Sequence, residues 1–212
     1  MENKKLVIFD FDGVLVNTID LAFYIQKKHN PDITKEYFHS FNNGNFFENY
    51  NKAIEEGKVK DIPDWEEHYL KGLLELNSHD VIQKLVLDLA SQYNLAIVSS
   101  TTSPHISKFL EQEKIRSCFS EILGTDVHQS KVVKIKKLLE DYKISPEDTV
   151  FVTDTLGDMR EGNECGVKSI GVTWGAHDRE TLEKGEPVAI VDDVLGLEEA
   201  IAMFFGKIPV HI

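Results

Sequence analysis

The chain has 212 residues, a mass of 24.1 kDa and a hydrophobic content of 42%. This length fits one large domain or a core domain with a small insert, and the composition excludes collagen-like, low-complexity and disordered chains. The 23 basic and 36 acidic residues give a formal net charge of −13. Such a charge repels phosphate backbones and anionic lipids, so we expect no nucleic-acid or membrane partner.

The apolar run that follows MENKK is too short for a signal peptide. No stretch approaches the roughly 20 apolar residues of a membrane span. Cys118 and Cys165 form no CxxC pair and have no histidine partner at zinc-finger spacing, which predicts reduced thiols. We therefore expect a cytoplasmic protein.

Runs rich in Val, Ile and Leu alternate with stretches of helical periodicity along the chain. The apolar runs predict buried strands, and helical spacing of apolar residues predicts helices over 78–93 and 131–142. The predicted strands are 6–10, 95–100, 121–126, 149–154, 169–174 and 189–193. This alternation indicates an α/β fold with a doubly wound parallel sheet.

The interval 17–80 interrupts that alternation. It contains no convincing strand, and its periodicity predicts helices over 18–29, 46–57 and 64–77. Ten of the twenty aromatic residues of the chain lie in this interval, most of them expected to form a small helical core. We predict a helical cap over 17–80, inserted into a core domain made of 1–16 and 81–212.

Carboxylates and hydroxyls follow several of the predicted strands. Ligands of open parallel sheets bind beyond the carboxyl ends of the strands, so these side chains are expected to converge. Crowded carboxylates need a compensating cation, and a set of oxygen ligands favours Mg²⁺. With Lys131 as a second positive charge, the cluster predicts a phosphate site. The residues that follow the strands are Asp10, Asp12, Ser99, Ser100, Asp126, Asp154 and Asp158.

Two assignments in this cluster have close competitors. A shift of one residue in the strand end would exchange Ser99 and Ser100. Lys134 competes with Lys131, which we prefer because it begins the helix after Ser130.

Other polar residues near the strand ends have simpler interpretations. An Asp at the end of a strand is more often a helix N-cap or a turn residue than a catalyst, and we interpret Asp126 and Asp178 in this way. His128 and His177 lie on predicted loops, where exposed histidines are common, and substrate contact is the less favoured interpretation for both.

Four segments resemble the ordered motifs of the haloacid dehalogenase superfamily: VIFDFDGVL, LAIVSS, Lys131 and VTDTLGDM. The resemblance covers the whole chain and is closest to members similar to phosphoglycolate phosphatases and phosphomutases, which insert a helical cap after the first motif. It implies a core with a Rossmann-like sheet and a phosphatase that hydrolyses small-molecule phosphomonoesters. The chain has Thr153 and Ser100 where the superfamily commonly has Gly and Asn.

The resemblance also implies roles for individual residues. Asp10 would be the nucleophile that forms an aspartyl-phosphate, and Asp12 would be the general acid and then the general base. Ser99, with Ser100 beside it, and Lys131 would bind the phosphoryl oxygens.

The implied metal is Mg²⁺. Its ligands would be Asp10, Asp12 through its main-chain carbonyl, and Asp154, while Asp158 would bind directly or through water.

The sequence leaves two alternatives to a phosphatase open. A phosphomutase of the same fold would return the phosphoryl group to a second hydroxyl. A non-catalytic binding protein would be expected to lack one of the motif carboxylates, and none is missing. A dehalogenase is disfavoured because Asp12 is present.

The sequence leaves the oligomeric state open and does not name the phosphorylated metabolite. Between 17 and 80 there are seven Lys, twelve acidic residues and no Arg, a net charge of 7 − 12 = −5. Arg is the side chain best suited to bind a second anionic group. We therefore predict a substrate whose organic part is neutral, in preference to phosphoglycolate.

Overall fold

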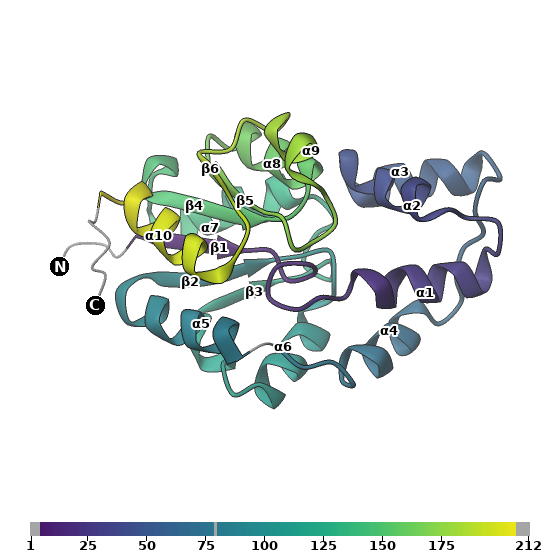
Figure 1. The fold of residues 1–212 in the computed structure, drawn as a ribbon, viewed down its shortest axis with the longest axis horizontal. Coiled ribbons are helices and arrows are strands. Elements are labelled where there is room, and N and C mark those ends of the chain that lie inside the picture. Colours follow the sequence, from purple (N-terminus) through teal and green to yellow (C-terminus); the bar gives the residue numbers. More distant parts are fainter. Residues whose placement is uncertain (1–4, 79, 207–212) are drawn as a thin grey trace.

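The computed structural model describes residues 5–78 and 80–206. Its centre is a six-stranded, fully parallel sheet with the strand order β3-β2-β1-β4-β5-β6 (Figure 1). All six predicted strands are confirmed, and their first and last residues differ from the predicted ones by at most three positions. The strands are β1 Leu6–Phe9, β2 Asn94–Val98, β3 Glu121–Leu123, β4 Thr149–Thr153, β5 Lys168–Val172 and β6 Ala189–Val191.

Helices cover both faces of the sheet. The helices of the core are α5 Asp80–Gln92, α6 Ser103–Gln112, α7 Lys131–Tyr142, α8 Leu156–Glu164, α9 Arg179–Glu183 and α10 Val194–Phe204. Alternate residues of a strand face opposite sides: Val7 and Phe9 pack with α5, α6 and α10, whereas Leu6 and Ile8 pack with α7 and the end of α8. The sheet is therefore buried on both faces, as expected for a doubly wound α/β fold.

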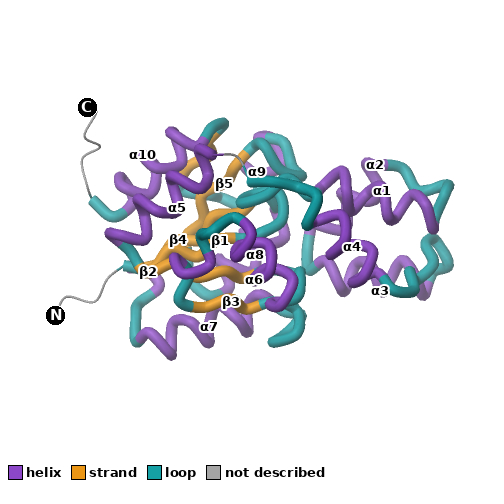
Figure 2. Tube along the Cα trace, turned by 90° about the horizontal axis from the view of Figure 1, so that it is seen from below, coloured by secondary structure: helices purple, strands orange, loops and turns teal. Residues whose placement is uncertain are grey.

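A helical insert joins β1 to β2 and forms a separate lobe (Figure 2). It contains the predicted helices as α1 Ile19–His29, α3 Phe46–Glu55 and α4 Trp65–Leu73, and also a short helix α2 Lys35–Ser40 that was not predicted. The insert has an aromatic core of its own, built around Phe38 and Phe41. The expected role of the aromatic residues as a small helical core is confirmed for these side chains.

Polar contacts fix the ends of the insert helices and tie the insert to the core. The Thr34 hydroxyl and the Asn45 side chain accept N–H bonds in the first turns of α2 and α3. Asn45 also donates to Glu161 of α8 (3.2 Å), and Arg160 donates to the carbonyl of Asn43 (2.7 Å). These contacts hold the insert against the middle of α8, next to the carboxyl edge of the sheet.

Two sequence-based expectations concern the cysteines and the membrane. Cys118 and Cys165 are both free thiols, as predicted. Along residues 5–78 and 80–206, none of the helices combines the length and the apolar character needed to cross a lipid bilayer.

Phe109 of α6 should be a main contributor to the stability of the core. It is fully buried, and its ring meets the edge of Phe11 at 5.5 Å between centroids, so it supports the turn that follows β1. We expect Phe109→Ala to lower the free energy of unfolding in urea by about 3–5 kcal/mol. The control is Leu195→Ala, because this side chain is 73% exposed. A loss for Phe109→Ala as small as that of the control would contradict this view of the core.

Candidate active site

A cavity of about 160 Å³ lies between the carboxyl edge of the sheet and the insert. The ends of β1, β2 and β4 contribute polar side chains to one wall, and helices of the insert form the opposite wall. The structure therefore brings the four predicted carboxylates to one cavity, as expected for residues that follow neighbouring parallel strands. The polar residues that line it from the core include Asp10, Asp12, Ser100, Thr101, Lys131, Asp154 and Asp158.

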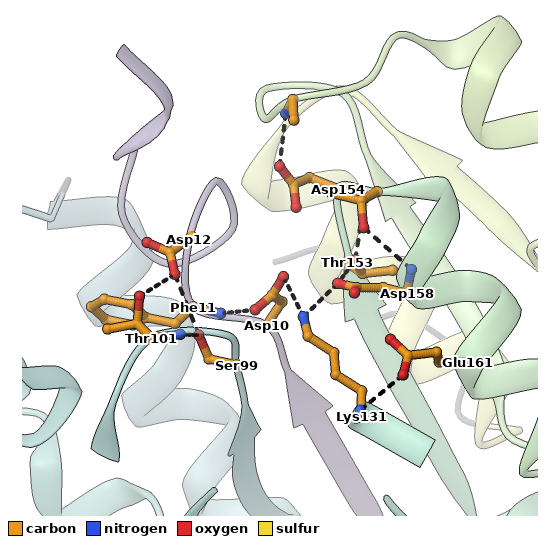
Figure 3. A network of polar contacts seen from close by, with 12 residues as sticks. Asp10, Phe11, Asp12, Ser99, Thr101, Lys131, Thr153, Asp154, Asp158 and Glu161 are labelled. Carbon is orange, nitrogen blue, oxygen red and sulfur yellow. Dashed lines mark hydrogen bonds and ion pairs between the residues drawn. The ribbon is translucent and has the colours of Figure 1, made fainter. Parts of the chain in front are cut away.

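Lys131 bridges two of these carboxylates at the bottom of the cavity (Figure 3). Its Nζ lies 2.9 Å from Asp10 Oδ2 and 2.7 Å from Asp158 Oδ2. All three side chains are buried. The main chain of Phe11 donates a further hydrogen bond to Asp10 Oδ1 (2.7 Å). Asp10 is thus held in a fixed orientation beside a positive charge.

Burial shapes the protonation of this cluster. It raises the pKa of Asp10 well above the ordinary value, against the opposing charge of Lys131, and it raises the pKa of Asp154 to about 7. Burial acts to raise the pKa of Asp158 as well, but the charge of Lys131 together with hydrogen bonds from Asp10, Lys131 and Thr153 lowers it overall. Burial acts to lower the pKa of Lys131, yet Asp10 and Asp158 together raise it. A single ammonium group therefore compensates three buried carboxyl groups only in part.

Asp154 is enclosed by main chain. Its Oδ2 accepts a hydrogen bond from the Ala176 N–H (2.7 Å). A Cβ atom added to Gly13 or to Gly175 would come within 2.1 Å of the same oxygen, so only glycine fits at either position. Gly13 also has a positive φ of 73°. The glycine of the DxDG segment is thus explained by the close approach of its turn to Asp154.

The donor atoms of this cluster fit a hard divalent cation. Asp154 Oδ1 is buried and accepts no hydrogen bond from the described residues, and the charge on the carboxyl groups exceeds what Lys131 offsets. Oxygen ligands of this kind suit Mg²⁺. Within the described part of the chain, however, no three His, Cys, Asp or Glu side chains are grouped closely enough to hold an ion as they stand.

Asp12 has different surroundings from the other carboxylates. Its Oδ1 accepts hydrogen bonds from the hydroxyls of Thr18 (2.7 Å) and Tyr69. Its Oδ2 accepts from the hydroxyls of Thr101 (2.8 Å) and Ser99 (3.3 Å). Figure 3 shows Asp12 on the side of the cavity away from Asp154 and Asp158. The hydroxyls orient the Asp12 carboxylate without a second charge beside it.

Tyr69 makes this contact from the insert. It belongs to α4 and is buried. Burial, followed by the negative charge of Asp12, raises the pKa of its phenol well above the ordinary value, so the phenol remains a hydrogen-bond donor. A residue of the insert therefore takes part in orienting a carboxylate of the core.

Sequence reasoning did not single out Thr18, Tyr69 or Thr101. Thr101 had a signal, since it continues the polar run that follows β2. Tyr69 had none that separated it from the other aromatic residues of the insert, which mostly pack among themselves.

Ser99 and Ser100 have different surroundings, and so do Lys131 and Lys134. Ser99 is fully buried; its hydroxyl contacts Asp12 and accepts from the Thr101 N–H, whereas Ser100 lines the cavity. Lys131 reaches Asp10, while Lys134 donates to the carbonyls of Ser99 (2.5 Å) and Gly124 (3.4 Å). Lys134 therefore braces the end of β2, and Lys131 is the lysine that faces the cavity.

The two aspartates expected to be structural and the two loop histidines make structural contacts, and His177 is buried rather than exposed. Asp178 is the N-cap of α9, and Asp126 accepts the N–H of Ser103 in the first turn of α6 (2.6 Å). His177 accepts the N–H of Leu156 (3.0 Å), and His128 accepts that of Ser130 (2.9 Å). These interpretations of Asp126 and Asp178 are confirmed.

Two further side chains, those of Thr153 and Glu161, make hydrogen bonds to residues of the cluster. Thr153, which stands where the superfamily commonly has glycine, donates to Asp158 Oδ2 (2.7 Å). Glu161 accepts the N–H of Lys131 (2.9 Å) and so fixes the start of α7. The departure at Thr153 thus adds a hydrogen bond that orients Asp158.

Comparisons with known proteins agree with this architecture. The chain is 24% identical to a phosphoglycolate phosphatase of Synechococcus elongatus, over 96% of this chain and 100% of the relative. It is 26% identical to one of Aliivibrio fischeri, over 95% and 98% of the two chains. A haloacid dehalogenase-like hydrolase from Streptococcus pneumoniae has the same fold, with a TM-score of 0.75 at 23% identity over 96% and 100% of the two chains.

The family model described as haloacid dehalogenase-like hydrolase matches residues 7–172, which include the sheet from β1 to β5, the insert and the carboxylate cluster. The match covers most of the 212 residues. The chain therefore belongs to the haloacid dehalogenase-like hydrolase family.

Proposed function

We propose that the chain is a phosphatase that hydrolyses small-molecule phosphomonoesters through a covalent aspartyl-phosphate on Asp10. The proposal rests on one observation: the carboxylates of the cavity have two different kinds of surroundings. Asp10 lies 2.9 Å from Lys131, whereas Asp12 is held apart by hydroxyls. A nucleophile needs a neighbouring positive charge to receive the phosphoryl group, and a separate carboxyl group can then exchange protons.

In the first step, an oxygen of Asp10 attacks phosphorus and the bond from phosphorus to the ester oxygen breaks. Asp12, protonated at this stage, gives its proton to the departing alcohol. Lys131 neutralises the phosphoryl oxygens, and the Ser100 hydroxyl, which lines the cavity at the end of β2, donates a hydrogen bond to them, while the Ser99 hydroxyl donates to Asp12.

In the second step, Asp12 accepts a proton from water while the water oxygen attacks phosphorus. The bond from phosphorus to Asp10 breaks, and inorganic phosphate leaves. The hydroxyls around Asp12 donate to its oxygens and so hold the carboxylate in place for this step.

Magnesium is the proposed cofactor. Asp10, Asp154 and Asp158, with the main-chain carbonyl of Asp12, would hold it, and its charge would offset the buried carboxylates and the phosphoryl oxygens. The buried, unpaired Oδ1 of Asp154 supports this assignment.

The helical segment 17–80 is proposed as the cap and residues 1–16 with 81–212 as the core that carries the chemistry. Contact between Tyr69 of the insert and Asp12 of the core supports this division of roles. Release of inorganic phosphate distinguishes the phosphatase from a phosphomutase, which would return the phosphoryl group to a sugar or alcohol hydroxyl.

Asp10→Asn should abolish phosphate release from a generic aryl phosphate while leaving the fold intact. The amide is a poor nucleophile, and removing a buried charge relieves repulsion from Asp154 and Asp158. Asp141→Asn is the matched control, because Asp141 lies on α7 in an exposed pair with Lys137. Phosphate assays and circular dichroism test both variants. Substantial turnover by pure Asp10→Asn would contradict the covalent mechanism.

A chelator should abolish activity, and Mg²⁺ should restore it. Ca²⁺ should bind and inhibit, because its longer and more numerous ligand bonds misplace the nucleophile. The measurement is phosphate release from one aryl ester after chelation and after addition of each metal. Full activity in excess chelator would rule out the proposed magnesium site.

Tyr69→Phe should weaken proton transfer by Asp12, because one of its orienting hydroxyls is lost. A poor alkoxide leaving group needs that proton, whereas p-nitrophenolate does not. We expect kcat/KM to fall about tenfold for an alkyl phosphate and little for p-nitrophenyl phosphate. Tyr24→Phe, at a side chain that is 68% exposed, is the control. Equal losses with both esters would argue against this role for Tyr69.

A further inference from the structure

We infer that the cavity selects phosphate esters of small, uncharged and mainly apolar alcohols, and that it discriminates against esters whose organic part carries a carboxylate or a second phosphate. This inference rests on the proposed phosphatase function. It extends that function to the part of the substrate that does not react.

The wall opposite the carboxylates is largely hydrocarbon. The insert contributes aliphatic side chains from α1 and aromatic side chains from α2, α3 and α4, among them Ile19, Ala22, Phe38, Phe46 and Trp65. Trp65 stacks on Tyr69, with 6.1 Å between ring centroids, so this aromatic surface continues to the residue that contacts Asp12. An apolar substrate group would gain free energy by leaving water for such a surface.

The charged groups around the cavity are nearly all negative. Among the described residues that line it, Lys131 is the one lysine or arginine, and it is already paired with Asp10 and Asp158. The phosphoryl group would compete for this same cation. A second anionic group on the substrate would therefore find no positive charge of its own. The acidic residues that line the cavity are Asp10, Asp12, Glu66, Asp154, Asp158 and Glu161.

The arginines of the chain are all engaged elsewhere. Arg116 donates to the carbonyl of Phe119, and Arg160 donates to that of Asn43. Arg179 pairs with Asp192 (2.8 Å). None of the three lines the cavity. The side chain best suited to bind a second carboxylate or phosphate is therefore missing from the site.

Glu66 adds a negative charge on the insert side. It follows Trp65 at the start of α4 and lines the cavity, and its side chain is 54% exposed. Its Oε2 lies 3.1 Å from Nδ1 of His105 on α6. A positive charge on that imidazole would be offset by Glu66 itself. Glu66 thus repels an anionic substrate group as it enters between the insert and the core.

This inferred selectivity differs from that expected for an enzyme whose substrate is phosphoglycolate, the compound in the names of the relatives. The proteins of Synechococcus elongatus and Aliivibrio fischeri are phosphoglycolate phosphatases, and phosphoglycolate carries a carboxylate next to its phosphate ester. In this chain that carboxylate would face Glu66 and the aromatic wall.

Two esters that differ in charge alone give the sharpest test. Phosphoglycolate and its amide, carbamoylmethyl phosphate, have nearly the same size and the same ester linkage. For the wild-type protein with Mg²⁺ we expect kcat/KM to be at least about tenfold higher for the amide than for the acid, because only the acid is repelled. A higher kcat/KM for phosphoglycolate would overturn the inference.

Glu66→Lys should lower the ratio of kcat/KM for the amide to kcat/KM for phosphoglycolate about tenfold, because the lysine attracts the carboxylate. Glu67→Lys is the matched control, since Glu67 makes the same charge change one residue away on an exposed position that does not line the cavity. Equal effects of the two substitutions would show that Glu66 does not act locally, and would overturn its assigned role in the selectivity.

Binding to the Asp10→Asn variant separates this inference from the proposed function. Calorimetric titration of that variant with the two esters needs no turnover. Tighter binding of the amide than of phosphoglycolate supports the selectivity, even if the wild-type protein hydrolyses neither ester. The lack of hydrolysis by the wild-type protein would overturn only the phosphatase assignment. Tighter binding of phosphoglycolate would overturn the selectivity whatever the activity.

Discussion

The burial of several carboxyl groups around one lysine is the constraint on which the rest of the site depends. Asp10 and Asp158 share the ammonium of Lys131, and Asp154 lies beside them with one oxygen unpaired. Burial penalises the charged forms, so the cluster is stable only with protons or with added positive charge. The magnesium ion of the proposed phosphatase would supply that positive charge.

The parallel sheet supplies this arrangement directly. Strands β1 and β4 are neighbours in register, with Phe9 opposite Val152, so the residues that follow them emerge side by side. Gly13 and Gly175 let main chain approach Asp154 where any side chain would collide. The fold therefore holds mutually repelling carboxylates at the carboxyl edge of the sheet. Burial of the apolar core on both faces of the sheet offsets the unfavourable free energy of this repulsion.

The sequence was informative wherever a local pattern had a physical cause. Apolar runs located every strand, and Asp10, Asp12 and Asp154 followed from their places after strands. The short helix α2 and the exact ends of the helices were missed, because six residues carry too little periodicity. Tyr69 could not be recognised, since its contact with Asp12 depends on how the insert folds back over the core. The same is true of Glu66, whose position beside the cavity is a tertiary feature.

A phosphoryl group that passes through Asp10 can be trapped there before water removes it. An excess of enzyme mixed with an aryl phosphate and Mg²⁺ is quenched in acid within one turnover, digested with pepsin at low pH and analysed by mass spectrometry. We expect a peptide with a phosphoryl group on Asp10 that is lost in alkali, as is typical of an acyl phosphate. Turnover with no phosphorylated peptide at any quench time, or with the phosphoryl group on another residue, would contradict it.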